Sequence, residues 1–384
     1  MRAHQISWRP AVGWRPSADV GSAADLVLFF GSRAALTDGA RYRELRERYP
    51  AAKIIGCSTG GQIRADEVGD DEIVASAIEF SDTRVRLAVE EIADSDGSLA
   101  CGNALGRALS ANDLAAIFVL SDGLNVNGSQ LVAGIGAQVG PHIPLTGGLA
   151  GDGAAFERTL VSGDCEPRSN LVAAIGLYGH NIRVGHGSAG GWDVFGPRRT
   201  ITRAERNVLF ELDGQPALDL YERYLGEEES RGLPGTGLLF PLKVYDPANA
   251  EHTVVRTLLA VDRAKRAMTF AGDVPEGWTA QLMRGNFENL VGGAESAARQ
   301  ASAGPAYAGD KVAVLVSCIG RRLLMGQRVA DEVDAAGSVL GPRTLRLGFY
   351  SYGEISPHEV SGVCELHNQT MTITTISEAV SQRS

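Results

Sequence analysis

Reactive side chains gather in the last quarter of the chain, each soon after an apolar, strand-like run. The clearest example is VAVLVSCIGRR at residues 312–322, and GFYSYGEISP (348–357) and ELHNQTM (365–371) follow it. The side chains of these segments that could do chemistry are Cys318, Arg321, Arg322, Tyr352, Glu354, His367 and Asn368. Ligands of α/β proteins bind beyond the ends of strands. We therefore expect these side chains to line one pocket for a polar or anionic small molecule.

The CIGRR segment combines a thiol with two guanidinium groups. A sharp turn through Gly320 into a helix would present free backbone N–H groups and the positive end of that helix. Arginine forks bind carboxylate or phosphate, and nearby positive charge lowers the pKa of a thiol. The alternative is that Cys318 is buried and unreactive, with the arginines in solvent, because free cysteines usually belong to the core.

Glu354 lies in a glycine-bounded turn beside Tyr352, and an aromatic wall with one carboxylate suits an amine or a planar ligand. An α-amino acid would satisfy both ends of such a pocket, with its ammonium at Glu354, its carboxylate at the two arginines and Asn368 fixing its orientation. His367 could donate to a ligand, act as a base or bind a metal. The commoner role for a lone histidine is a hydrogen bond to the backbone.

Glycine-rich loops in the first half also follow strand-like runs. GCSTGG (56–61) formally matches the Gly-x-Ser-x-Gly elbow of hydrolases, but no helical pattern follows it, so a turn that binds an anion or packs against a second loop is the favoured interpretation. LSDGLNVNG (120–128) and TGGLAGDG (146–153) are neither Walker A loops nor dinucleotide fingerprints. The candidate ligand-binding residues of these three loops are Cys57, Ser58, Thr59, Ser121, Asp122, Gly148 and Asp152.

Composition restricts the classes of protein to consider. The 384 residues carry a formal net charge of -10, which disfavours nucleic acid as a partner. The five cysteines are widely spaced without a Cys-x-x-Cys pair, so neither a disulfide framework nor a cysteine-rich zinc site is expected. No apolar run has the length of a signal peptide core or a membrane span. We expect a cytoplasmic protein without a membrane or metal partner.

Strand-like and helical patterns alternate along the chain. DLVLFFG (25–31), a helix over 39–49 and AKIIG (52–56) predict a β-α-β unit, and residues 171–179 and 181–189 predict a hairpin. This alternation predicts an α/β (α+β) fold with two domains, each a mixed, largely parallel β-sheet flanked by helices. The predicted divisions are an irregular N-terminal arm (1–24), a first α/β domain (25–200) and a second (201–384).

The motifs, taken together, resemble the FIST sensory family. The segments that carry the resemblance are GCSTGGQI (56–63), FVLSDGLNVNG (118–128), LTGGLAGDG (145–153), CIGRR (318–322), GFYSYGEISP (348–357) and ELHNQTM (365–371). They occur in order within residues 25–378, so residues 25–200 resemble a FIST N domain and residues 201–384 a FIST C domain. The chain departs from fused members of the family, because it carries no kinase, GGDEF or transmembrane segment, and its N-terminal arm is shorter than the family's usual leading helix.

The resemblance implies a ligand sensor in bacterial signal transduction, with amino acids among the ligands expected. FIST proteins work with histidine kinases, cyclic-di-GMP enzymes or chemoreceptors. We therefore predict a stand-alone, non-enzymatic sensor that signals through a separate partner protein.

Two alternatives remain open. One branch of the family is described as haem-dependent nitric-oxide sensors, and a non-covalent haem b would need an axial ligand, for which His367, His186 and Cys318 are the candidates. The other alternative is a hydrolase or transferase that uses Cys318 or Ser58 as nucleophile and His367 as base.

Overall fold

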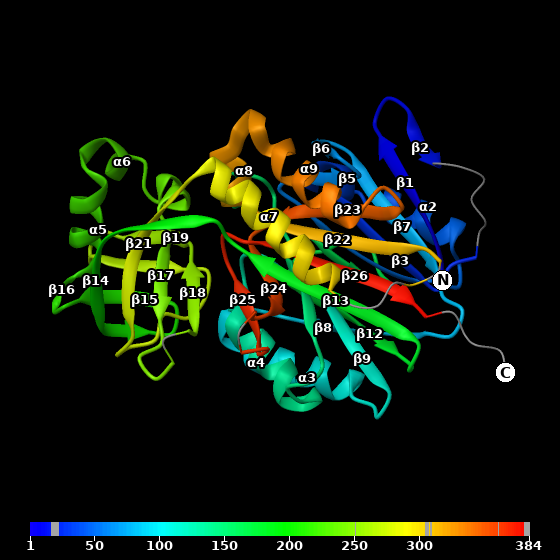
Figure 1. Cartoon of the computed structure of the whole chain (residues 1–384), viewed down its shortest axis with the longest axis horizontal. Helices are drawn as coiled ribbons and strands as arrows, with labels where there is room; N and C mark the ends of the chain where they lie inside the picture. Colours follow the sequence, from blue (N-terminus) through cyan, green and yellow to red (C-terminus); the bar gives the residue numbers. More distant parts are fainter. Residues whose placement is uncertain (17–22, 250, 304–306, 308, 360, 380–384) are drawn as a thin grey trace.

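The computed structural model describes residues 1–16, 23–249, 251–303, 307, 309–359 and 361–379. These residues form a main unit built on three six-stranded sheets and a smaller unit, residues 192–285, built on one eight-stranded sheet. We call the smaller part the β unit. Figure 1 shows the β unit at one end of the main unit, joined to it through β14 and β21.

The first sheet belongs to the N-terminal third of the chain and has the order β11-β4-β3-β7-β1-β2. Its strands are β1 (Arg2–Arg9), β2 (Gly13–Pro16), β3 (Leu26–Gly31), β4 (Lys53–Ser58), β7 (Ile73–Glu79) and β11 (Val161–Gly163), and its helices are α1 (Arg33–Leu36) and α2 (Ala40–Arg48). Tyr42 and Leu45 of α2 pack on Val27 and Phe29 of β3. The β3-α2-β4 segment is the β-α-β unit that the sequence predicts, with β3 and β4 parallel.

The second sheet joins strands from both halves of the chain in the order β25-β24-β10-β9-β12-β8. Its strands are β8 (Arg84–Glu91), β9 (Leu114–Ser121), β10 (Leu145–Leu149), β12 (Leu171–Tyr178), β24 (Gly353–Pro357) and β25 (Cys364–His367). The helical segments beside it are η1 (Ser95–Gly97), α3 (Ser98–Leu109) and α4 (Gly128–Val139). Asn127 begins α4 because its side chain accepts a hydrogen bond from the backbone N–H of Gln130.

The third sheet also mixes the two halves, in the order β13-β26-β22-β23-β5-β6. Its strands are β5 (Gln62–Arg64), β6 (Glu67–Gly69), β13 (Ile182–Ala189), β22 (Lys311–Cys318), β23 (Thr344–Ser351) and β26 (Met371–Glu378). Its helical segments are α7 (Phe287–Ser302), α8 (Ile319–Met325), η3 (Gly326–Arg328) and α9 (Val329–Leu340). Small residues let α7 approach β13 closely, since a Cβ on Gly187 would lie 2.1 Å from the carbonyl oxygen of Ala297.

The β unit is an antiparallel sheet with two short helices. Its strands are β14 (Trp192–Glu205), β15 (Val208–Leu212), β16 (Gln215–Pro216), β17 (Leu242–Tyr245), β18 (Thr253–Arg256), β19 (Leu258–Asp262), β20 (Ala267–Phe270) and β21 (Thr279–Gly285). Its helical segments are α5 (Ala217–Leu225), α6 (Glu227–Arg231) and η2 (Gly235–Leu239). Leu218 and Tyr221 of α5 pack on Ile201 and Phe270, so the β unit has a core of its own.

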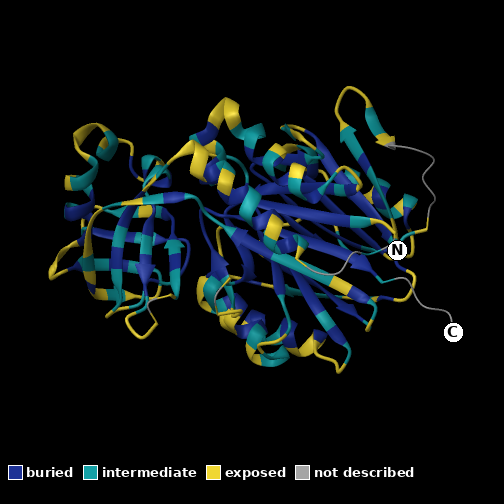
Figure 2. Cartoon of the chain, in the orientation of Figure 1, coloured by how far each residue is buried: buried dark blue, intermediate teal, exposed yellow. Residues whose placement is uncertain are grey.

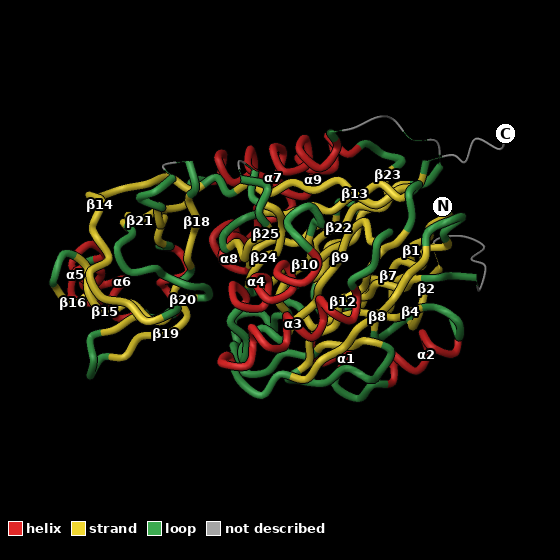
Figure 3. Tube along the Cα trace, turned by 90° about the horizontal axis from the view of Figure 1, so that it is seen from below, coloured by secondary structure: helices red, strands yellow, loops and turns green. Residues whose placement is uncertain are grey.

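The three sheets of the main unit share one core. Phe30 of β3, Leu120 of β9 and Val316 of β22 belong to the same buried apolar cluster, although each comes from a different sheet. Helices α7 and α9 cover one side of this assembly, and α3 and α4 cover the opposite side (Figures 1 and 3). The strands between them are buried along most of their length (Figure 2).

The chain therefore has the predicted α/β fold of two domains with mixed sheets, but the details differ from the prediction. Parallel pairing among the described strands is confined to β3–β4, β9–β10 and β22–β23, so antiparallel pairs predominate. The predicted division between residues 200 and 201 falls inside β14. The N-terminal arm is not irregular, because β1 and β2 pair with each other and β1 joins β7.

Candidate functional site

Five of the motif-bearing loops meet at one place, where β4, β9, β10, β22 and β23 end. We call this place the motif junction, defined by residues 58–61, 121–123, 149–153, 318–322 and 350–354. The backbone N–H of Gly60 donates to the Tyr350 carbonyl over 2.8 Å, and the N–H of Gly151 donates to the Ser58 carbonyl over 2.9 Å. These loops therefore lie together and tie the two halves of the chain to each other, whereas the pocket predicted for the side chains of residues 318–368 stays a prediction.

The candidate residues of the first glycine-rich loop are buried, and the hydroxyl groups of two of them form hydrogen bonds within the protein. Ser58 is fully buried, and its hydroxyl donates to the Gly151 carbonyl over 2.8 Å and accepts from the Leu160 N–H over 2.9 Å. Thr59 Oγ1 donates to the Gly31 carbonyl over 3.2 Å. Burial raises the pKa of Cys57 well above its ordinary value. The loop packs against a second loop, as the favoured interpretation expected.

The next two loops are fixed by their own carboxylates. Asp122 is buried and accepts from the N–H groups of Leu124 and Asn125 over 2.8 and 2.9 Å, while Ser121 Oγ is buried without a partner in the described part of the chain. Asp152 pairs with Arg33 over 2.9 Å and accepts from the hydroxyl of Tyr352.

Gly148 of the third glycine-rich loop and Tyr352 of the GFYSYGEISP segment both pack against other parts of the protein. Gly148 lies opposite Glu354 in the β10–β24 pair, where a Cβ would come within 2.8 Å of Val316. The Tyr352 ring stacks on Phe156 with centroids 4.4 Å apart, so it packs within the protein instead of facing a cavity.

Cys318 does not have the lowered pKa that the sequence suggested. Its side chain is buried, and this burial, with a further contribution from the nearby Glu354 carboxyl, raises the pKa of the thiol far above its ordinary value. The strand-to-helix turn is present, since Cys318 is the N-terminal cap of α8, but the positive helix end is outweighed by desolvation. The expectation of an activated thiol was wrong, and the alternative of a buried cysteine holds.

The two arginines of CIGRR also have partners within the protein. Arg321 is fully buried, forms a 2.7 Å ion pair with Glu332 of α9 and donates to the carbonyls of Gly190 and Leu290. Arg322 lies over the Tyr350 ring and pairs with both carboxylate oxygens of Asp70, over 2.8 and 2.9 Å. Both guanidinium groups are therefore held by groups of the described chain, and the expectation that the arginines lie in solvent fails as well.

Glu354 is a fully buried carboxyl group within the motif junction. It accepts from Ser351 Oγ over 2.6 Å and from Thr370 Oγ1 over 2.9 Å. Burial raises the pKa of Glu354 to about 8, although these hydrogen bonds act in the opposite direction. At neutral pH the group is therefore largely protonated, which suits a buried structural position better than the binding of an ammonium.

The segment of residues 367–370 lies against the β unit. His367 Nε2 is 3.0 Å from the Ser356 carbonyl, and burial lowers the pKa of His367 to about 4. Asn368 Oδ1 accepts from the Thr257 N–H over 3.4 Å, while Gln369 Nε2 donates to the Leu238 carbonyl over 2.8 Å. Asn368 Nδ2, Thr257 Oγ1 and Gln369 Oε1 are buried without hydrogen-bond partners in the described residues. Such orphaned groups are where ordered water is expected.

A cleft of about 300 Å³ opens beside this segment, between the main unit and the β unit. We call it the interdomain cleft. It is lined by Ser129, Gln130, Ala133, His252, Val254, Arg256, Asp273, Pro275, Trp278, Val363, Cys364, Glu365 and Leu366. Its size is in the range of small-molecule sites, and its lining combines an apolar wall with a few charged groups.

Arg256 and Glu365 are the charged groups of the cleft that retain unused hydrogen-bonding capacity. Arg256 Nε donates to the Asp273 carbonyl over 2.7 Å and Nη1 donates to the Leu366 carbonyl over 3.2 Å, but Nη2 has no partner among the described residues. Burial lowers the pKa of Arg256 to about 10, so it remains charged at neutral pH. Glu365 Oε2 is buried and likewise has no partner within the described chain.

His252 lines the cleft and links the two units. Its Nε2 lies 2.6 Å from Glu365 of β25, and its Nδ1 lies 3.2 Å from Asp246 of the β unit. Burial lowers the pKa of His252, but the hydrogen bonds and negative charges of these two carboxylates outweigh burial, so the pKa is raised overall. When it is protonated, the ring can therefore donate to two carboxylates, one on each side of the boundary between the units.

The chain is matched by the profile of the FIST N domain over residues 25–215 and by that of the FIST C domain over residues 217–357. The chain belongs to the FIST family. FIST domains are sensory domains, which agrees with the resemblance found in the sequence. The two profiles meet at β16 in the β unit, so this part of the FIST fold is assembled from both.

Among curated proteins, the FIST chain is similar to an uncharacterized protein of Methanocaldococcus jannaschii, MJ1623. The two are 29% identical over 202 residues, which is 47% of this chain and 36% of the other protein. The chain therefore spans little more than a third of the length of that relative.

Of the three haem-ligand candidates of this FIST chain, His367 and Cys318 are buried within the fold, and neither they nor His186 lines the interdomain cleft. Within the described residues, no three His, Cys, Asp or Glu side chains are grouped as a metal ion requires. The described helices also include none with the length and apolar character needed to cross a membrane.

The sequence did not predict the residues of the cleft, because they come from separate segments and meet only in the folded chain. Arg256 and His252 lie in a segment with an ordinary strand pattern, and Glu365 opens the ELHNQTM motif two residues before His367. Only Glu365 had a local signal that could have led to it.

Proposed function

We propose that this protein is a sensor that binds a small zwitterionic molecule, such as an amino acid, in the interdomain cleft and signals through a separate protein. The observation that carries the proposal is a pair of oppositely charged groups in one cleft: Glu365 Oε2, which is buried without a partner, and Arg256 Nη2, which is not used by the hydrogen bonds of Arg256 in the described residues. The ligand carboxylate would accept from Arg256, and its ammonium would donate to Glu365. Trp278 and Leu366 supply an apolar wall for the rest of the ligand.

The position of the cleft supports a sensory role. One wall comes from α4 and β25 of the main unit, and the other comes from β18 and residues 273–278 of the β unit. A ligand in contact with both walls would favour one arrangement of the two units over others, which is how binding free energy becomes a conformational signal. A histidine kinase or a cyclic-di-GMP enzyme is the class of partner that the family suggests.

An enzymatic role has less support. Cys318 and Ser58 are the candidate nucleophiles, and both are buried, the first with a raised pKa and the second with its hydroxyl engaged by backbone groups. A nucleophile needs access to its substrate and an activating base. We therefore place the function of the protein in binding.

Isothermal titration with a panel of amino acids and organic acids tests the proposal. At least one amino acid is expected to bind, and Arg256→Met should weaken it by at least about tenfold, because a charge-assisted hydrogen bond is lost. Glu365→Gln should weaken amino acids but spare the matching organic acids, which lack the ammonium group. Arg223→Met, an exposed change on α5, is the matched control and should leave affinity unchanged. Binding by no member of the panel, with folded protein verified by circular dichroism, would overturn the proposal.

A further inference from the structure

A second pocket lies at the far side of the main unit, where the β1–β2 hairpin meets β5. It has a volume of about 310 Å³ and its lining includes three arginines, Arg9, Arg15 and Arg64, with the polar side chains of Gln5 and Ser7. We call it the arginine pocket. None of its residues belongs to the motif junction or to the interdomain cleft.

The sequence of β1 explains why one face of the hairpin is polar. Successive side chains of a strand point to opposite faces, so Gln5, Ser7 and Arg9 share one face. Ile6 and Trp8 occupy the other face and pack in the core with α2. In the hairpin register Arg15 lies directly opposite Ser7, which adds a second guanidinium to the polar face.

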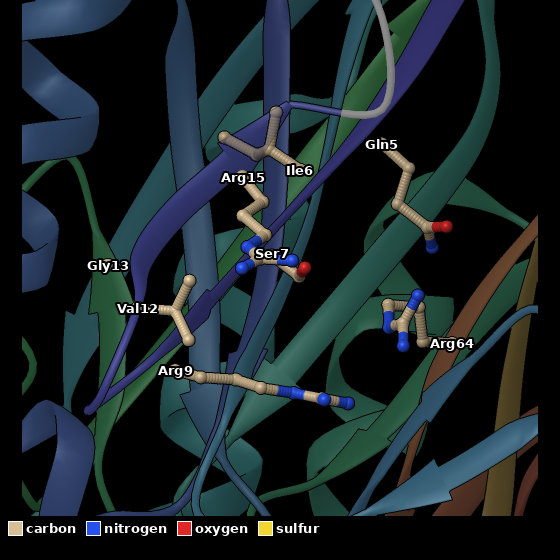
Figure 4. A pocket seen from close by; sticks show the side chains of 8 residues that line it. All are labelled: Gln5, Ile6, Ser7, Arg9, Val12, Gly13, Arg15 and Arg64. Carbon is tan, nitrogen blue, oxygen red and sulfur yellow. The ribbon is translucent and has the colours of Figure 1, made fainter.

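The third arginine comes from a different sheet. Arg64 ends β5, and the side chain of Gln5 donates to the Arg346 carbonyl of the neighbouring β23 over 2.9 Å, which holds the hairpin beside that sheet. Figure 4 shows the guanidinium groups of Arg9 and Arg64 and the amide of Gln5 turned toward a common space, with Arg15 and Ser7 at its other side.

The charges in this space are unevenly compensated. Arg9 pairs with the buried Glu72 over 2.7 Å, and Arg64 pairs with Glu67. Arg15 has no partner among the described residues, and Arg64 Nε is buried without one. The Glu67 carboxylate also lies 3.9 Å from Arg9, but its side chain is 64% exposed and can therefore turn out into solvent. The three arginines would then face Glu72 alone, leaving an excess of two positive charges.

We propose that the arginine pocket binds a phosphate dianion, either free phosphate or the phosphoryl group of a small metabolite. The excess charge matches that of a phosphate at neutral pH, and guanidinium forks from three directions match its tetrahedral set of acceptor oxygens. Glu67 acts as the competing anion that occupies Arg64 when phosphate is absent. This site is independent of the amino acid site proposed above.

Two substitutions with opposite expected effects test the proposal on the full chain. Sodium phosphate is titrated by calorimetry at low ionic strength, with sodium chloride at equal ionic strength as the blank. Arg15→Gln should weaken phosphate binding by at least about tenfold, since it removes the uncompensated charge. Glu67→Gln should strengthen it severalfold by removing the competitor. Arg107→Gln, at an exposed arginine of α3 without a partner in the described residues, is the control and should change nothing.

The ligand panel separates the sources of the dianion. Glycerol 3-phosphate binding more tightly than inorganic phosphate would support a phosphorylated metabolite, and equal affinities would support free phosphate. Tighter binding of succinate than of either phosphate would overturn the assignment to phosphate. Absence of binding at about 10 mM, or equal weakening by Arg15→Gln and Arg107→Gln, would overturn the site itself.

Discussion

Arg321 is fully buried, and its guanidinium is held by Glu332 and two backbone carbonyls. We expect Arg321→Met to lower the free energy of unfolding by about 3–5 kcal/mol, because Glu332 would remain as a buried charge without its ion-pair partner. Urea denaturation with linear extrapolation measures this change.

The double variant Arg321→Met, Glu332→Gln provides the internal check. Removing the second charge should restore part of the lost stability, whereas Arg107→Met on the surface should change stability by no more than about 0.5 kcal/mol. A double variant less stable than Arg321→Met alone would contradict the role given to the buried charge.

The same residue shows what sequence reasoning can and cannot predict about a site. CIGRR correctly predicts a strand, a turn and a helix, and hence where Arg321 and Cys318 lie. Whether a guanidinium faces a ligand depends on its partner, and Glu332 lies eleven residues further on, in another helix. The pKa of the Cys318 thiol is unpredictable for the same reason, because it depends on burial by groups that come from distant segments.

At the scale of elements, the parallel pair of β9 and β10 contains one of the closest backbone approaches among the described glycines. Gly147 of β10 has φ +131°, and a Cβ there would lie 1.9 Å from the carbonyl oxygen of Val119 in β9. Gly147→Ala is expected to destabilise the protein by more than about 2 kcal/mol, since neither the backbone angle nor the neighbouring carbonyl can adapt. Thermal and urea unfolding measure the effect.

A helical glycine gives the matched control. Gly136 of α4 has no atom within 4 Å of an added Cβ, so Gly136→Ala should stabilise the protein by about 0.5–1 kcal/mol through its helix propensity. Equal effects of the two substitutions would refute the packing argument for Gly147.

Element types were predictable from the sequence more readily than pairings. Residues 171–178 and 182–189 are strands, as their apolar patterns indicate, but they do not form the expected hairpin, because β12 pairs with β8 and β9 whereas β13 pairs with β26. The short turn between them crosses from one sheet to another. Conversely, the alternation of Gln5, Ser7 and Arg9 with Ile6 and Trp8 is a strand pattern that could have revealed β1.

At the scale of the whole molecule, the two halves of the sequence are interleaved instead of standing side by side. β24 and β25 complete a sheet begun by β8, β9, β10 and β12, and β5 completes a sheet dominated by the C-terminal half. The motif loops are therefore the places where the halves meet, which explains why their polar groups bond to one another. The β unit stands apart from this arrangement, and the cleft proposed for the ligand lies at its boundary.

The strength of the contact between the two units at that boundary should depend on pH through His252. Its pKa is raised above the ordinary value of 6.5, so the charged bridge to Asp246 and Glu365 contributes fully below about pH 6.5 and is lost as pH rises through the folded pKa. His358, with its ring centroid 5.3 Å from that of His252, and Arg256 are the other titratable groups nearby. Global stability would not isolate this effect, since the raised pKa of Glu354 also makes stability fall between about pH 4.5 and 8.

Hydrogen exchange of the β17–β18 hairpin isolates the contribution of His252, because Asp246 and His252 lie in the loop that joins these strands. After correction for intrinsic rates, protection of the hairpin should fall between pH 6 and pH 9 in the natural protein, as the ring loses its charge and one of the two N–H groups that face the carboxylates. In His252→Gln the neutral side chain can still donate a hydrogen bond but has no charge to lose, so protection should be lower at pH 6 and nearly independent of pH. An equal fall in both proteins would assign the pH dependence to another group and leave His252 as a neutral contact between the units.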